Sequence, residues 1–257
     1  YHDATGEDPY TVPMRIAPGA HFTMGGLWSD YDQMTSVDGL FVGGEAGNNY
    51  HGANRLGANS LLSACVDGWF TLPLSVPNYL AGVSREAPLA HDAPEAVEAL
   101  DAVRGRIDRL MQNETGTRPA TFHRRLGEIL YRGCGVSRSD ATLRTALTEL
   151  AELKEQFWQD VHVAGSGDRL NQELERAGRV ADFIELAELM VTDALDRTES
   201  CGAHFREEFA TPEGEAQRND DEWCFVSAWE TTAEGRHIRH VEPLTFETVP
   251  LQTRDYR

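Results

Sequence analysis

A chain of 257 residues is long enough to bury a hydrophobic core in one or two domains. Hydrophobic residues make up 40% of it and charged residues 25%, which are globular proportions and exclude fibrous and membrane-embedded classes. Lys and Arg number 23 against 42 Asp and Glu, and the formal net charge of -19 repels phosphate backbones. We therefore expect no nucleic-acid partner.

The cysteines and the apolar segments bear on the cellular compartment. The four cysteines lie far apart and form no C-x-x-C pair, which favours a reducing environment. The longest uncharged run, residues 68–84, contains Pro73, Pro77 and Asn78, so we expect no membrane-spanning helix there. The N-terminus has neither the basic nor the apolar region of a signal peptide.

Residues 11–83 are rich in glycine and poor in charge, which is typical of buried or ligand-facing backbone. The apolar run 40–42, bounded by glycine, predicts a buried strand. Residues 58–70 carry small and apolar side chains at helical spacing. This part of the chain is therefore expected to contain a strand, a glycine-rich loop and a helix.

From about residue 92 to residue 197, apolar residues recur at steps of three and four, which predicts amphipathic helices. Proline or capping signals mark the starts at Pro94, Thr117-x-Pro119 and Ser137-x-x-Asp140. Glycines mark the breaks at residues 116, 133–135 and 165–167. We predict a four-helix, bundle-like unit, followed by a small α+β segment with strands at 225–229 and 244–251.

The densest group of candidate functional residues runs from His51 to Leu62, with the sequence HGANRLGANSLL, and leads directly into the predicted helix. A helix N-terminus presents unpaired N–H groups and attracts an anion or an electron-rich cofactor edge. Arg55 is suited to bidentate binding of a carboxylate because its guanidinium is a planar fork. The alternative, a structural ion pair of Arg55 with Glu45 or Asp67, remains open.

Two further groups carry weaker signals. The segment His21-Phe22-Thr23-Met24-Gly25-Gly26 offers an imidazole donor beside two glycines that leave room for a ring system. The segment Gly43-Gly44-Glu45-Ala46-Gly47 follows the predicted strand, where an acidic side chain commonly meets a ribose hydroxyl. Each group alone is more often structural than functional.

Taken in this order and at these distances, the three groups resemble the flavoprotein subunit of succinate dehydrogenase and fumarate reductase. A segment near the C-terminus, Glu199-Ser200-x-Gly202-Ala203-His204-x-Arg206, resembles the same family, and the likeness covers essentially the whole chain. It implies an α+β fold that begins in the C-terminal part of a two-dinucleotide-binding-type FAD domain. The implied segments are the end of a capping domain (1–20), the FAD-domain part (21–83), a helical bundle domain (84–197) and a small C-terminal domain (198–257).

The resemblance also implies roles for individual residues. His21 and Arg55 match the pair that clamps a dicarboxylate substrate against the flavin. Glu45 matches the cofactor-binding glutamate, and Ser60 with Leu61 matches the backbone that contacts the isoalloxazine ring of FAD. The implied reaction is the oxidation of succinate to fumarate by hydride transfer to FAD. The implied partners are an iron–sulfur subunit and, through it, membrane anchor subunits and quinone, at the cytoplasmic side of the plasma membrane.

Departures from the family pattern limit what this chain is expected to do alone. The dinucleotide-binding glycine fingerprint, the histidine that bonds covalently to FAD and the proton-shuttle arginine belong upstream of His21 in the family. None of the three is in this sequence, which therefore resembles the C-terminal part of a longer flavoprotein. We expect no catalytic residue within the chain. Cys201 stands where many relatives have arginine, which puts a surface contact in doubt.

Several alternatives remain at the level of sequence. Fumarate reductase uses the same residues in the reverse direction, and L-aspartate oxidase shares the clamp. A non-catalytic fragment that acts as an assembly module belongs to another functional class. A metal site at His237 and His240 lacks acidic or thiol partners, and a nucleophilic Ser200 or Cys201 with His204 lacks an orienting acid, so we predict neither.

Overall fold

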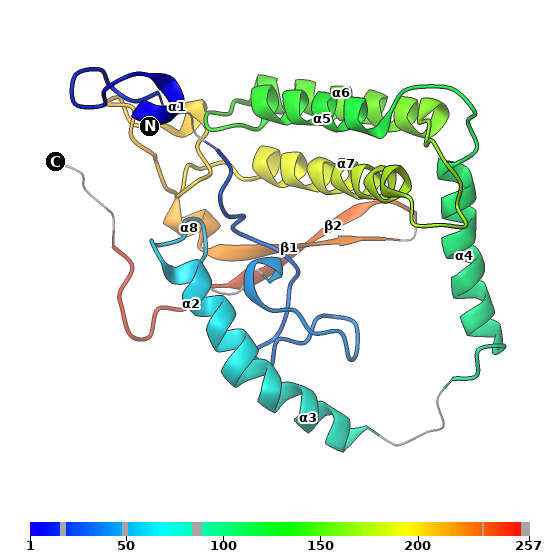
Figure 1. Cartoon of the computed structure of the whole chain (residues 1–257). Coiled ribbons are helices and arrows are strands. Elements are labelled where there is room, and N and C mark those ends of the chain that lie inside the picture. Colours follow the sequence, from blue (N-terminus) through cyan, green and yellow to red (C-terminus); the bar gives the residue numbers. More distant parts are fainter. Residues whose placement is uncertain (16–18, 48–50, 84–88, 233, 253–257) are drawn as a thin grey trace. The chain divides into compact units, whose positions relative to one another are not determined.

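The computed structural model describes residues 1–15, 19–47, 51–83, 89–232 and 234–252. The chain divides into two compact units, Tyr1–Gly82 and Val83–Arg257 (Figure 1). The expected boundary between residues 83 and 84 adjoins residues 84–88, which lie outside the described ranges. The division into four segments stays a prediction.

The first unit combines extended loops with one long helical stretch. Its helical elements are α1 (His2–Thr5), the 3₁₀ turn η1 (Gly44–Ala46), α2 (Asn59–Val66), the π-helical turn η2 (Asp67–Thr71) and α3 (Leu72–Gly82). The strand predicted at 40–42 is wrong, because Phe41 forms only an isolated bridge with Met34. Val42 is buried as predicted, and its amide donates to the Gln33 carbonyl at 2.9 Å.

The elements α2, η2 and α3 follow one another without a break, and α3 contains both Pro73 and Pro77. Pro73 is the second residue of α3 and directly follows the π-helical turn η2. Pro77 lies inside α3 and leaves one carbonyl of the preceding turn without its helical donor. Within the part of the chain that the structure describes, no helix is long and apolar enough to cross a membrane.

The second unit is built on four helices, as predicted. These are α4 (Pro94–Leu110), α5 (Pro119–Gly133), α6 (Asp140–Asp160) and α7 (Gln172–Asp196). Pro94 and Pro119 occupy first-turn positions, as expected. The capping residue of α6 is Ser139 and not Ser137, because the Ser139 hydroxyl accepts from the Thr142 amide and Thr142 Oγ1 accepts from the Ser139 amide.

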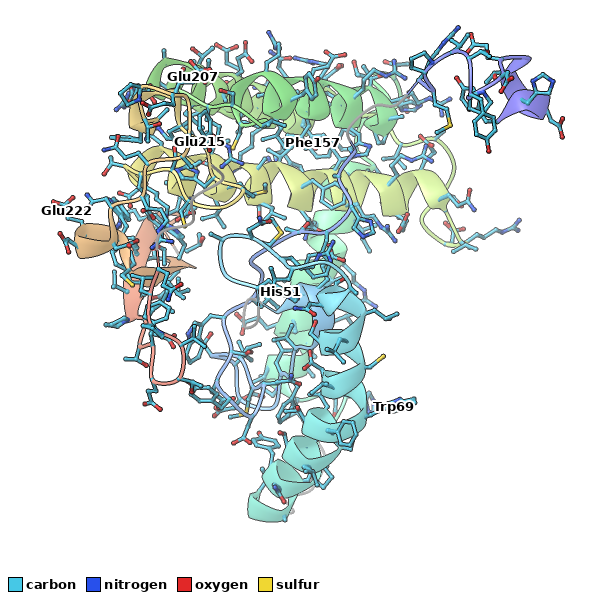
Figure 2. All side chains as sticks on the ribbon, turned by 90° about the vertical axis from the view of Figure 1, so that its left-hand side faces the viewer. His51, Trp69, Phe157, Glu207, Glu215 and Glu222 are labelled. Atoms are coloured by element: carbon cyan, nitrogen blue, oxygen red, sulfur yellow. The ribbon has the colours of Figure 1, made fainter. Side chains whose placement is uncertain are left out.

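The core of this unit lies between α5, α6 and α7, which run alongside one another, whereas α4 is steeply inclined to them (Figure 1). Phe157 is fully buried among these helices (Figure 2), and its ring meets Phe122 edge-on with centroids 5.2 Å apart. The predicted apolar face of α4 is buried only at its C-terminal end. Leu110 is 3% exposed, whereas Val97, Leu100 and Val103 are 43–56% exposed.

The last part of the chain forms a two-stranded antiparallel hairpin with two short helical turns before it. The elements are η3 (Glu207–Phe209), α8 (Asp220–Trp223), β1 (Phe225–Thr231) and β2 (His237–Pro243). The strand predicted at 225–229 is confirmed, and the one predicted at 244–251 is wrong. The turn closed by the Thr232 amide and the Arg236 carbonyl, 2.9 Å apart, pairs Thr231 with His237, so the returning strand ends at Pro243.

Candidate functional site

Two of the three predicted groups are joined directly by hydrogen bonds. The backbone amide of Thr23 donates to Glu45 Oε1 at 2.7 Å, and the Leu27 amide donates to the Ala46 carbonyl at 2.8 Å. A Cβ atom on Gly26 would overlap the Ala46 carbonyl oxygen, so only glycine permits this approach. The segment 21–26 therefore lies against the segment 43–47.

The segment 43–47 is in turn fixed to the helical stretch of the same unit. Asp67, which is 1% exposed, accepts the Gly44 amide at Oδ2 over 2.6 Å. Gly44 has a φ of 64°, and an added Cβ would lie 3.4 Å from that of Ala64 in α2. A buried carboxylate that accepts a backbone amide thus holds the turn that presents Glu45.

Arg55 lies over the ring of Phe22, with its Cζ atom 5.2 Å from the ring centroid. Its Nη1 atom donates to the Leu56 carbonyl at 3.0 Å, and its buried Nε atom has no hydrogen-bond partner among the residues that the structure describes. Among the described residues we find no ion pair to Arg55, so the structural pairing with Glu45 or Asp67 is not observed. The guanidinium therefore retains a charge for an incoming anion.

The structure brings the His21 segment and the Arg55 segment together through Phe22. His21 itself is exposed, and it immediately precedes the ring over which Arg55 lies. Glu45 is also exposed, although one of its oxygens is engaged by Thr23. The joint binding of a dicarboxylate by His21 and Arg55 stays a prediction.

Sequence reasoning missed roles for Phe22, His51, Ser63 and Asp67. The ring of His51 packs edge-on against that of Phe22 with centroids 5.1 Å apart, and its Nε2 atom lies 3.2 Å from Ser63 Oγ. Figure 2 labels His51, which lies four residues before Arg55 in the chain. Phe22 and His51 stood inside the quoted motifs, but only the folded chain shows that they touch.

The N-terminus of α2 has no side-chain cap. Its N-cap residue is Ala58, which makes no side-chain capping bond and has a φ of 65°. Ser60 is half-buried, whereas Leu61 is 73% exposed. An added Cβ on Gly52 or Gly57 would meet no atom within 4 Å. Uncapped amides beside open backbone are suited to the edge of a planar, electron-rich ring.

Two family models match most of this chain. The fumarate reductase flavoprotein C-terminal model matches residues 123–256, which is more than half of the chain. The FAD binding domain model matches residues 2–61, where all five predicted site residues lie. The chain belongs to the succinate dehydrogenase and fumarate reductase flavoprotein family. The resemblance drawn from the motifs is confirmed.

The relatives of this flavoprotein chain include proteins named succinate dehydrogenase, fumarate reductase and L-aspartate oxidase. The succinate dehydrogenase flavoprotein subunit of Bacillus subtilis is 34% identical over 255 residues, which cover 96% of this chain and 40% of that subunit. The L-aspartate oxidase of Synechocystis is 30% identical and is matched by 78% of this chain over 36% of its own length. A solved E. coli quinol fumarate reductase is 28% identical, with a TM-score of 0.82 over 98% of this chain and 41% of its own.

This flavoprotein chain thus spans about 40% of the length of the relatives that it matches. The structural likeness confirms the predicted α+β fold, and FAD is the cofactor of the family, as predicted. The uncapped N-terminus of α2 and the free space at Gly52 and Gly57 are compatible with that cofactor. The individual contacts of Glu45, Ser60 and Leu61 with FAD stay predictions.

The family segment 199–206 has a structural role in this flavoprotein chain. Arg206 is 3% exposed and donates from Nη1 to the Leu195 carbonyl at 2.9 Å, at the C-terminus of α7. The fully buried Ser200 accepts the Arg206 amide at 2.8 Å and donates its hydroxyl to the Arg206 carbonyl at 3.1 Å. The segment therefore closes the end of α7 and satisfies its last carbonyls.

His204 in the same segment is held as a neutral imidazole. Its Nδ1 atom lies 3.0 Å from Arg138 Nη1, and its Nε2 atom lies 3.2 Å from the Arg197 carbonyl. A guanidinium only donates, so Nδ1 accepts and Nε2 carries the hydrogen. Burial lowers the pKa of His204 to about 4, and burial also raises the pKa of the Cys201 thiol. Neither group is poised for nucleophilic or general-acid chemistry near neutral pH.

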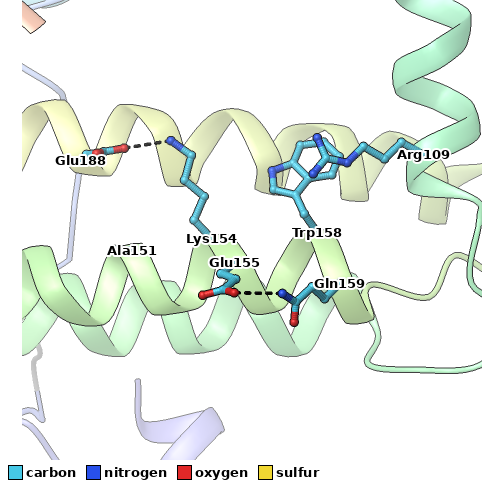
Figure 3. Close-up of a pocket in the computed structure, with 7 residues that line it drawn as sticks. All are labelled: Arg109, Ala151, Lys154, Glu155, Trp158, Gln159 and Glu188. Atoms are coloured by element: carbon cyan, nitrogen blue, oxygen red, sulfur yellow. Dashed lines mark hydrogen bonds and ion pairs between the residues drawn. The ribbon is translucent and has the colours of Figure 1, made fainter. Parts of the chain in front are cut away.

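A hollow of about 340 Å³ lies on the helical unit, between α4, α6 and α7 (Figure 3). Lys154 Nζ is 3.0 Å from Glu188 Oε2, and Gln159 donates to Glu155 at 3.0 Å. Arg109 lies over the ring of Trp158 with its Cζ atom 4.1 Å from the centroid. The lining side chains are thus engaged with one another, and we do not regard this hollow as the site of the flavoprotein.

Proposed function

We propose that this chain supplies the dicarboxylate clamp and the flavin-ring contacts of an FAD-dependent succinate dehydrogenase. The observation that carries the proposal is the position of Arg55. Its guanidinium lies over the ring of Phe22, the residue that follows His21 in the chain, and its buried Nε atom has no hydrogen-bond partner among the described residues. A guanidinium that pairs with no carboxylate in the described part of the chain is suited to one carboxylate of a small diacid.

The clamp would act by position and charge. Arg55 would hold one carboxylate with two parallel hydrogen bonds, and His21 would donate to the other. FAD, when bound, supplies the hydride acceptor. Glu45 would accept from the cofactor's ribose, and the amides of Ser60 and Leu61 would face the edge of its ring. A substrate held in this way is already oriented toward the flavin, so the step no longer bears the entropy cost of a bimolecular encounter. Fixed charges stabilise the polarised transition state.

We assign no proton-removing residue to this chain, because the proton-shuttle arginine of the resemblance belongs upstream of His21. The proposed partners are an iron–sulfur subunit and, through it, membrane anchor subunits that pass electrons to quinone. The proposed location is peripheral, at the cytoplasmic side of the plasma membrane. Support comes from the succinate dehydrogenase relative, which is matched by 96% of this chain.

Fumarate reductase is the second candidate. It is favoured by the likeness to the E. coli quinol fumarate reductase, with its TM-score of 0.82. The same clamp serves both directions of the reaction, because redox potentials and the electron partner set the direction. L-aspartate oxidase is the third, since the Synechocystis oxidase shares 30% identity.

The test is a comparison of substrates in the complete FAD-loaded flavoprotein that contains this chain. Dye reduction by succinate should exceed both dye reduction by L-aspartate and oxidation of reduced viologen by fumarate. Activity with L-aspartate alone would reject the proposal, and faster turnover with fumarate would favour the reductase. A purified complete flavoprotein without flavin absorbance would instead support a non-catalytic assembly module.

A further inference from the structure

The ring of Phe22 is contacted by two residues that come from a distant part of the chain. The Arg55 guanidinium lies over it at 5.2 Å, and the ring of His51 meets it at 5.1 Å with an interplanar angle of 88°. The ring is half-buried. Phe22 is therefore the physical link between the segment that carries His21 and the loop that carries Arg55.

His51 is itself fixed to the first turns of α2. Ser63 Oγ donates its hydrogen to the Ser60 carbonyl at 2.9 Å and lies 3.2 Å from His51 Nε2. A serine hydroxyl has a single hydrogen, so His51 Nε2 carries the hydrogen of the second bond and donates it to Ser63. The imidazole ring is thus held in one orientation by the helix that presents Ser60.

We propose that Phe22 and His51 are positioning residues for the dicarboxylate clamp, with His51 acting through Phe22 and Phe22 acting on Arg55. The inference rests on the proposed function of Arg55 in binding a dicarboxylate. It adds that the plane of the guanidinium is set by the aromatic face and not by an ion pair.

The physical reason is the small number of other restraints on Arg55. Its one hydrogen bond within the described ranges is that from Nη1 to the Leu56 carbonyl, and its Nε atom is buried without a partner. An arginine side chain has many rotamers, and ordering it on binding costs affinity. An aromatic face attracts the cation and leaves the N–H edge available, so the ring pre-orders the fork for a carboxylate.

The first experiment measures malonate binding to the complete FAD-loaded flavoprotein by isothermal titration calorimetry. Malonate is a suitable probe because its single CH₂ group cannot form a double bond with a neighbouring carbon. Phe22→Leu should raise the Kd for malonate about three- to tenfold, whereas Phe22→Tyr should stay within about twofold. Phe41→Leu is the matched control, because Phe41 is also half-buried and packs edge-on against Tyr79 without a cation.

The second experiment separates positioning from general packing. His51→Ala should raise the malonate Kd about threefold in the parent protein and not at all in the Phe22→Leu background, because His51 acts through the ring. His51→Gln, which keeps a donor toward Ser63, should recover part of the loss. Flavin content and thermal unfolding of each variant show that the fold is intact. Independent, multiplying effects of the two substitutions would overturn the inference.

The outcomes distinguish this inference from the proposed function. If Arg55→Gln leaves the malonate Kd unchanged, the dicarboxylate clamp itself is wrong. If Arg55→Gln weakens binding while Phe22→Leu and His51→Ala do not, only the positioning role is wrong. If Phe22→Leu does not fold, the His51→Ala variant decides, and an unchanged Kd in that variant overturns the inference.

Discussion

The backbone amide of Thr23 donates to Glu45 Oε1 at 2.7 Å, so the proposed cofactor-binding glutamate also holds the segment that carries His21. Glu45 would therefore both bind the cofactor and hold the His21 segment, and two substitutions distinguish these roles. Glu45→Gln keeps an oxygen for the Thr23 amide but removes the charge, whereas Glu45→Ala removes both.

We expect Glu45→Gln to keep malonate affinity within about twofold and to lose part of the bound flavin. Glu45→Ala should weaken both, with malonate binding reduced about five- to tenfold, because a hydrogen bond to a charged group contributes about 1.5–3 kcal/mol and part of the clamp remains. Flavin absorbance after gel filtration and calorimetry with malonate measure the two effects. Equal losses in the two variants would show that the Thr23 contact has no role in the clamp.

Arg55→Lys tests the shape of the cation rather than its charge. A lysine keeps the positive charge but cannot form two parallel hydrogen bonds, so we expect about a 10- to 100-fold rise in the Kd for malonate. Arg15→Lys serves as the control, because Arg15 is an exposed arginine of the same unit that pairs with Glu7. The control should change the Kd by less than twofold. An equal Kd for Arg55→Lys and the parent protein would remove the argument for a bidentate contact.

The sequence predicted the helices of the second unit well because their apolar residues repeat at a period that only a helix satisfies. It placed the cap of α6 on Ser137, although Ser139 makes the bonds, since both serines precede the helix and only geometry distinguishes them. The strand at 244–251 failed because the register of a hairpin is set where its two strands meet, and the pairing of Thr231 with His237 selects residues 237–243.

In the candidate site, too, the sequence predicted local features but not the contacts between residues that lie far apart in the chain. The sequence of the Arg55 loop predicted a carboxylate-binding role through its resemblance to the family, and that role stays a prediction. The contact between Phe22 and His51 joins residues 29 positions apart in sequence, since 51 − 22 = 29, and no periodic pattern encodes such a pair. The same holds for Asp67, whose bond to the Gly44 amide appears only when η2 packs on the turn.

The correction at the start of α6 can be tested directly. Ser139→Ala removes the acceptor of the Thr142 amide and should lower the free energy of unfolding by about 1 kcal/mol. Ser137→Ala removes only an exposed bond to Glu207 and should lower it by less than about 0.5 kcal/mol. Urea unfolding followed by far-ultraviolet circular dichroism compares them. The reverse order would restore Ser137 as the cap.

The end of α7 depends on Arg206. Its bonds to the Leu195 carbonyl and to Glu208 come from a side chain that is 3% exposed. Arg206→Ala should therefore lower the free energy of unfolding by about 3 kcal/mol, because it leaves buried carbonyls without donors. Arg236→Ala, at an exposed arginine 3.9 Å from Glu234, should change it by less than about 0.5 kcal/mol. Similar urea midpoints for the two variants would contradict the capping role.

His204 makes the stability of the second unit depend on pH. Burial, with smaller contributions from Arg138, Arg197 and Arg206, lowers its pKa from 6.5 to about 4, and the bond to the Arg197 carbonyl opposes this shift. The unfolded chain therefore takes up a proton at a higher pH than the folded one. The stabilisation is complete above about pH 6.5 and is lost progressively as the pH falls toward 4.

Because the ring is only partly buried, we expect this loss to reach about 1–2 kcal/mol between pH 6.5 and pH 4.5, less than the full linkage value. His204→Gln cannot titrate, so its free energy of unfolding should fall less steeply over this interval, even if it is lower at pH 7. Carboxylates titrate in both proteins, so the difference between the two curves isolates the histidine. His91→Gln, at an exposed histidine of the same unit, should run parallel to the parent protein. Parallel curves for His204→Gln and the parent protein would show that the imidazole is protonated in the folded state as readily as in the unfolded one.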